Sequence, residues 1–131
     1  MEHQLFHPAL VHFPIAFYVL EFLLLIFWAV KHDSAYERFA IFTFRLGYLA
    51  MLAAVGTGLF DAGGFSGIRG KVRPHFFAAL SVVVFYTVRA LFWRFGKKSN
   101  SAYAKIQLVG AAIGTILVLL TGFLGGEIVY D

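Results

Sequence analysis

The sequence predicts an all-α membrane protein: an up-and-down bundle of four transmembrane helices with both termini on the outer side. Of its 131 residues, 60% are apolar and 14% are charged, whereas soluble domains average about 45–50% and about 25%. The apolar residues gather in four stretches, each about as long as the roughly 20 residues that cross a bilayer as a helix. Because these stretches do not alternate in polarity, a transmembrane β-barrel is excluded. Residues 1–131 are therefore expected to form a single domain in lipid, which excludes a soluble enzyme.

The four expected helices run from Pro8 to Val30, from Phe39 to Phe60, from Pro74 to Phe95 and from Tyr103 to Ile128. Short polar or glycine-rich segments separate them, as expected of loops at the membrane surface. The first stretch is too long and too aromatic for a signal peptide and has no small-residue cleavage site. We therefore assign it to the mature fold.

Basic residues near the ends of the spans predict the orientation. One side of the membrane would carry six of them and the other three, the two sets being Lys31, Arg38, Arg94, Lys97, Lys98 and Lys105 against Arg69, Lys71 and Arg73. Cytoplasmic loops hold the excess of Lys and Arg, so the termini are expected on the periplasmic face of a bacterial inner membrane. The excess of 11 basic over 7 acidic residues is thus interpreted as a topology signal, and no nucleic-acid partner is expected.

Histidines and carboxylates gather at the predicted outer end of the bundle, the set being His3, His7, His12, His75, Asp61, Glu127 and Asp131. Such a set at one end of a helix bundle is typical of a metal or cofactor site. His12 opens the first span and His75 opens the third, at matched depth. Two histidines on two inward-facing helices can supply both axial ligands of one haem b.

Each of these residues also has a purely structural interpretation. His7 can cap a helix or lie at the interface, and His12 and His75 can be hydrogen-bonded without holding a ligand. Asp61 either orients a histidine through its second ring N–H or only ends its helix. The three basic residues of the outer loop either neutralise haem propionates or contact lipid headgroups and water.

Three charged residues fall inside the spans: Glu21, Arg45 and Arg89. Charges at such depth are costly unless they are paired or functional. We expect Glu21 to pair with one of the two arginines and fix the register of the bundle, while the second arginine snorkels towards the inner interface. A proton relay through Glu21 is the alternative.

Both ends of the chain carry patterns that resemble a large bacterial family of four-helix membrane proteins of unknown function. The family pattern His-Pro-x-x-Val-His-Phe-Pro is matched by residues 7–14, and Gly-Gly-x-x-Val-Tyr by residues 125–130. An aspartate ending the second helix and a histidine opening the third match Asp61 and His75. Some members are joined to Rieske-type domains, and the family is distantly similar to cytochrome-b-type bundles, so the resemblance implies redox surroundings.

Three hypotheses follow. In the first, a redox protein binds one haem b near the outer face through His12 and His75, with quinol or a periplasmic redox protein as the electron partner. In the second, a zinc, copper, nickel or iron ion is held by residues from the set His7, His12, His75, Asp61 and Glu127. In the third, the chain is a non-catalytic subunit or scaffold of a larger membrane complex. A homo-oligomer is left open, and no catalytic residue is identified.

Overall fold

The chain forms a bundle of four long α-helices in the computed structural model, which describes residues 10–61, 63–64, 66, 68–70, 72–96 and 101–130, without the side chains of 101 and 127–130. The helices are α2 (His12–Lys31), α3 (Ser34–Asp61), α4 (Val72–Phe95) and α5 (Ser101–Tyr130). All four are long and apolar enough to cross a membrane. The predicted fold class, an all-α bundle of four membrane-spanning helices, is confirmed.

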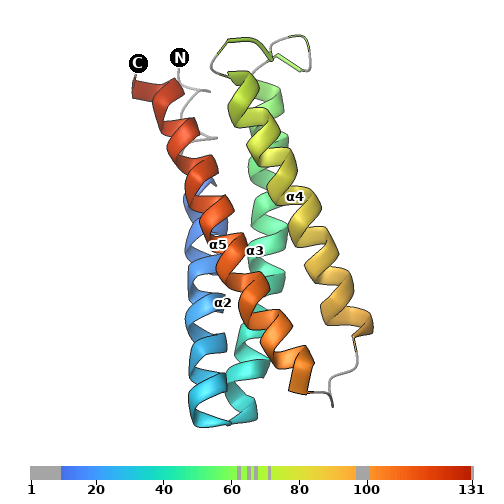
Figure 1. The fold of residues 1–131 in the computed structure, drawn as a ribbon. Coiled ribbons are helices and arrows are strands. Elements are labelled where there is room, and N and C mark those ends of the chain that lie inside the picture. The colour runs from blue at the N-terminus through green and yellow to red at the C-terminus, as the bar shows by residue number, and fades with distance from the viewer. Residues whose placement is uncertain are drawn as a thin grey trace.

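The helices alternate in direction, so their ends collect at two poles of the bundle. Figure 1 shows that α3 ends, α4 begins and α5 ends at the same pole, which we call the histidine end, and that α2 begins in the same half of the bundle but farther from the tip. At the other pole, the opposite end, α2 passes into α3, and α4 ends where α5 begins. Which pole faces the periplasm stays a prediction from the basic residues.

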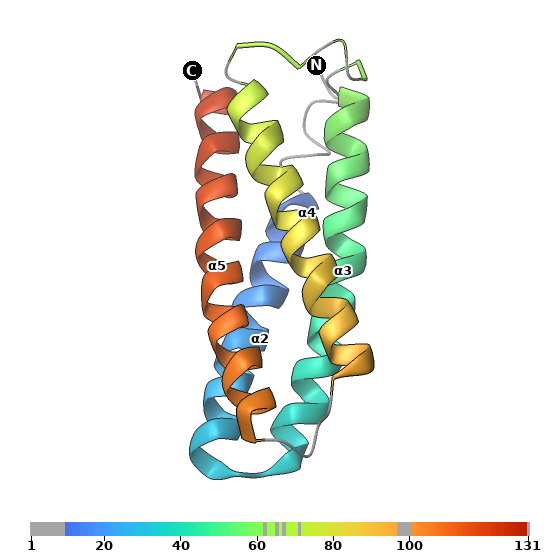
Figure 2. The same ribbon diagram turned by 45° about the vertical axis from the view of Figure 1, so that its right-hand side comes forward.

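Packing is uneven around the bundle. Helix α2 lies along both α3 and α5, and α4 lies along α5, whereas α3 and α4 meet over a short stretch only. Figure 2 shows α4 inclined relative to its neighbours. A direct polar link joins α3 to α4, a 2.8 Å hydrogen bond between the hydroxyls of Tyr48 and Thr87. The buried core contains aromatic side chains from all four helices, among them Tyr18, Phe44, Tyr86, Trp93 and Tyr103.

Helix ends follow from local backbone chemistry. Asp33 precedes α3, and its Oδ1 accepts the backbone N–H of Ala35 at 2.9 Å, as an N-cap does. At the far end of α3, the N–H groups of Gly63 and Gly64 donate to the carbonyls of Phe60 and Leu59. This is a Schellman termination, and Gly63 takes the left-handed conformation it needs, at φ 78°.

The observed helices extend beyond or stop short of the expected spans at several places. The second helix starts at Ser34 and not Phe39, because the capped first turn is polar and hydropathy does not mark it. The fourth runs from Ser101 to Tyr130 instead of Tyr103 to Ile128. The first begins at His12, and the expected start at Pro8 lies outside the described residues. Large apolar side chains remain exposed on every helix, as a lipid-facing surface requires.

Candidate functional site

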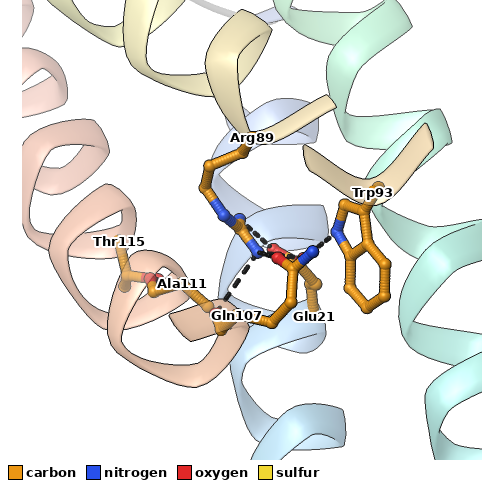
Figure 3. A network of polar contacts seen from close by, with 6 residues as sticks. All are labelled: Glu21, Arg89, Trp93, Gln107, Ala111 and Thr115. Carbon is orange, nitrogen blue, oxygen red and sulfur yellow. Dashed lines mark hydrogen bonds and ion pairs between the residues drawn. The ribbon is translucent and has the colours of Figure 1, made fainter. Parts of the chain in front are cut away.

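The first polar region is an ion pair buried between α2 and α4. Both terminal nitrogens of Arg89 donate to the carboxylate of Glu21, Nη1 to Oε1 and Nη2 to Oε2, each at 2.8 Å. Glu21 is fully buried and Arg89 is 5% exposed. A two-pronged contact of this kind is among the strongest that Arg makes. It joins two helices that lie diagonally across the bundle, as Figure 3 shows.

Neighbouring side chains add further hydrogen bonds to this pair. Arg89 Nη2 also donates to the side-chain oxygen of Gln107 on α5 at 3.1 Å. The indole N–H of Trp93, one turn further along α4, donates to Glu21 Oε2 at 3.4 Å. The cluster thus draws on α2, α4 and α5 (Figure 3). Because breaking it would leave a charge unpaired in lipid, it fixes the register of these helices.

Aromatic rings cover the Arg89 guanidinium on its other sides. Its Cζ atom lies 5.0 Å from the ring centre of Phe44 and 5.5 Å from that of Tyr86. Tyr86 in turn stacks on Tyr18, with ring centres 3.6 Å apart. Gly47 on α3 leaves room for the Tyr18 ring, because an added Cβ there would lie 2.9 Å from that ring. Cation–π contact in a dry core is worth about 2 kcal/mol or more.

These findings confirm one sequence prediction. Glu21 pairs with an arginine, and Arg89 is that arginine. Arg45 lies exposed on α3. Gln107 and Trp93 were not predicted as members of the cluster. Their signals were present, since a glutamine inside an apolar span is costly unless it has a partner, and Trp93 follows Arg89 at the helical spacing of four residues.

The second polar region lies at the histidine end. His75, in the first turn of α4, is half-buried, and its Nδ1 lies 3.1 Å from the backbone oxygen of Thr121 on α5. A carbonyl only accepts, so Nδ1 carries the hydrogen. In the neutral ring, Nε2 is then the nitrogen with the lone pair. Gly125 makes room for the ring, because a Cβ there would lie 3.0 Å from His75 Cε1.

His12 is the first residue of α2. Its neighbour one turn along, Ile15, packs against α5 at Gly122, where an added Cβ would meet Ile15 Cδ1 at 3.1 Å. His75 contacts the same stretch of α5, at Thr121 and Gly125. Ile15 of α2 and His75 of α4 therefore meet α5 at neighbouring levels. His12 itself is exposed.

The other predicted site residues at this end are only partly described. Asp61 ends α3 and its Oδ2 is buried without a hydrogen-bond partner in the described part of the chain. Arg69 is exposed and donates to the backbone oxygen of Ser66 at 3.2 Å. Arg73 is exposed and lies over the ring of Phe77 at 5.8 Å. His7, Lys71 and the side chain of Glu127 lie outside the described residues.

In the described part of the chain, no three of the candidate ligands lie close together. Among the described residues, no group of three or more His, Asp or Glu side chains lies close enough to hold a metal ion. His12, His75 and Asp61 lie in the terminal turns of α2, α4 and α3 that face the histidine end. Together, the spans, the lipid-facing apolar surface and this polar end define an integral membrane protein of four helices.

The comparison with protein families agrees. The chain belongs to the family described as predicted membrane protein (DUF2231), whose family model matches residues 4–131. No curated protein and no solved structure matches the chain. Family membership therefore supports a membrane protein and leaves the activity to be proposed from the site.

Proposed function

We propose that the protein is a membrane redox carrier that binds one haem b at the histidine end through His12 and His75. The observation that carries the proposal is the hydrogen bond from His75 Nδ1 to the Thr121 carbonyl. Histidines that ligate a metal usually donate their other ring N–H to a carbonyl or carboxylate, which fixes the ring and raises its basicity. His75 has this arrangement, with Nε2 as the ligating nitrogen.

The surroundings of His75 suit haem, a flat ligand that carries two acidic propionate groups on one edge. Gly125 gives the imidazole close access to α5. The unpartnered Oδ2 of Asp61 offers an acceptor for a histidine N–H at the same end. Arg69 and Arg73, with Lys71 between them in sequence, supply cations for the propionates. When bound, the haem would supply one-electron chemistry, and the chain's part is to hold it and set its polarity.

Haem requires fewer protein ligands than a single metal ion does. Zinc and related ions take three or four protein ligands. A haem iron needs two imidazoles, one from each of two helices. In the ion hypothesis, zinc, copper, nickel or iron is held by residues that include His7 and Glu127. An absorption spectrum and a metal analysis of one protein sample distinguish it from the haem hypothesis.

The test is an absorption spectrum of protein purified from haem-replete cells, with metal analysis of the same sample. We expect a Soret band and one haem per chain, with the band lost in His12→Ala and in His75→Ala. His32→Ala is the matched control, because His32 is exposed at the opposite end, and it should retain the band.

Two results would overturn the proposal. One is a haem-free protein that holds a stoichiometric metal ion, lost when His12 is replaced, which would establish the ion hypothesis. The other is a Soret band that both histidine variants keep, which would place the haem ligands elsewhere. A quinol or a soluble periplasmic redox protein is the expected electron partner, at the outer face of a bacterial inner membrane.

A second candidate function is favoured by Arg45. This arginine is exposed on a membrane-spanning helix, next in sequence to Phe44, whose ring contacts the buried ion pair. A cation facing lipid at that depth is costly, and a neighbouring subunit with a carboxylate would remove the cost. We therefore keep membership of a larger membrane complex as the alternative. Co-purification of a partner that is lost in Arg45→Leu, from preparations without haem or metal, would favour it.

A further inference from the structure

Four polar side chains line the seam between α4 and α5 beside the ion pair. Tyr86 and Arg89 come from α4, and Tyr103 and Gln107 come from α5. Their exposed fractions are 0%, 5%, 2% and 1% respectively. Each is a side chain that normally finds hydrogen-bond partners for all its polar atoms when it is buried.

Each of the four retains one polar atom without a hydrogen bond in the described part of the chain. These atoms are the hydroxyls of Tyr86 and Tyr103, Nε of Arg89 and Nε2 of Gln107. The Tyr86 hydroxyl lies close to Arg89 and Thr115, and the Tyr103 hydroxyl lies close to Gln107, but none of these contacts has the distance and angle of a hydrogen bond. An unsatisfied polar group in a membrane interior costs several kcal/mol. Four of them in one seam therefore indicate a common ligand.

The four atoms form a ladder along α5. Tyr103 and Gln107 are themselves on α5, Gly110 lies beside Arg89 Nε, and Gly114 lies beside the Tyr86 hydroxyl. The levels 103, 107, 110 and 114 are three or four residues apart along α5. Side chains at neighbouring levels also contact each other, as Arg89 Nη2 and Gln107 Oε1 do at 3.1 Å, so a bridging water would bind beside the unpartnered atoms and not between the levels.

Glycine makes room for the side chains of Arg89 and Tyr86 at two levels of the seam. An added Cβ at Gly110 would lie 3.1 Å from Arg89 Nε, and one at Gly114 would collide with the Tyr86 hydroxyl. Val82 and Val118, one turn beyond Tyr86 and Gly114 towards the histidine end, are buried apolar residues at 5% exposure each.

We propose that the α4–α5 seam is a hydrated half-path, in which ordered water binds Tyr103, Gln107, Arg89 and Tyr86 in turn. The opposite end is the expected side of entry, since Tyr103, the third residue of α5, is the member of the set nearest to that end. The path ends at Tyr86, where Val82 and Val118 separate it from the histidine end. It gives the Glu21–Arg89 pair contact with water from one side of the membrane only. The inference does not rest on haem binding.

The test is synchrotron hydroxyl-radical footprinting of the wild-type protein in detergent or nanodiscs, read by mass spectrometry. Radiolysis of bound water oxidises the rings next to it. Tyr18 is a matched control inside the same protein, because it is also fully buried, it stacks on Tyr86, and its hydroxyl donates to Met51 Sδ at 3.5 Å. We expect Tyr86 and Tyr103 to be oxidised several-fold faster than Tyr18.

Two variants locate the path. Gly110→Ala places a methyl group beside Arg89 Nε and should lower oxidation of Tyr86 while leaving Tyr103 unchanged. Gly56→Ala is its control, because nothing lies within 4 Å of the added Cβ, and it should change neither tyrosine. Gln107→Leu removes the middle rung and should act as Gly110→Ala does.

Oxidation of Tyr86 no faster than that of Tyr18 in the wild-type protein would overturn the half-path. So would Tyr86 oxidation that both Gly110→Ala and Gln107→Leu leave unchanged. If one variant loosens the bundle, Tyr18 oxidation rises as well. In that case, the oxidation rates of Tyr86 and Tyr18 in the wild-type protein and in the other variant test the half-path.

Discussion

The two polar regions of this bundle differ in how their charges are satisfied. At the Glu21–Arg89 pair, both carboxylate oxygens and both terminal guanidinium nitrogens have protein partners from three helices. At the histidine end, His75 Nδ1 bonds to a backbone carbonyl, and Asp61 keeps a buried oxygen without a partner among the described residues. The first arrangement, which we call the structural tie, pairs opposite charges across helices, although Arg89 Nε has no partner in the described part of the chain. The second is the one that we propose to hold a ligand.

The largest expected effect breaks the structural tie. Glu21→Leu leaves Arg89 buried without its counter-ion and should lower the free energy of unfolding by about 3–5 kcal/mol. Glu21→Leu combined with Arg89→Met removes both charges and should recover most of that loss. Unfolding in mixed micelles with increasing SDS measures both. Equal destabilisation by the single and the double variant would show that the charges do not act as a pair.

The next effect concerns close packing beside the tie. Gly114→Ala drives a methyl group into the Tyr86 hydroxyl, and overpacking of this kind costs about 1–3 kcal/mol. Gly56→Ala meets nothing within 4 Å and should stabilise α3 by about 0.5–1 kcal/mol, since glycine is a poor helix former. The same unfolding assay compares the two, and a result of equal sign for both would contradict the packing described.

A smaller effect is expected at Trp93. Trp93→Phe keeps a ring in the core but removes the indole N–H that donates to Glu21 at 3.4 Å. The bond is long, so the loss should be about 1 kcal/mol. A loss of stability as large as that of Glu21→Leu would mean that Trp93, and not Arg89, is the main partner of the Glu21 carboxylate.

The smallest effect on stability is expected at the histidine end. His75→Ala removes one hydrogen bond to a carbonyl and should cost about 0.5–1 kcal/mol, although it should abolish haem binding. Thermal unfolding of the variant, followed by circular dichroism, measures the cost. A collapse of the fold in His75→Ala would assign His75 to the structural tie and remove the contrast between the two regions.

Much of the fold could be predicted from sequence because apolar length alone defines spans in lipid. The pairing of Glu21 with an arginine was also predictable, since an unpaired charge is costly there. The choice of Arg89 over Arg45 was not, because it depends on how α2 and α4 face each other across the bundle. The stacking of Tyr18 on Tyr86 likewise depends on tertiary register, and Gln107 becomes meaningful only once α5 is placed beside α4.

At the histidine end, the matched depth of His12 and His75 stays a prediction, while Ile15 and His75 contact neighbouring residues of α5. The sequence did not predict the Thr121 carbonyl as the partner of His75. Backbone acceptors near a helix end carry no side-chain signature, so only the packed structure shows them. The ligand set that includes His7 and Glu127 stays a prediction.

The most direct measurement compares the haem content of two variants, one altered at the buried ion pair and one at the histidine end. We expect the charge-free double variant Glu21→Leu with Arg89→Met to keep the Soret band of the wild-type protein, and folded His75→Ala to lose it. A double variant without haem beside a His75→Ala protein that retains it would contradict the assignment, and would place the ligand at the buried pair.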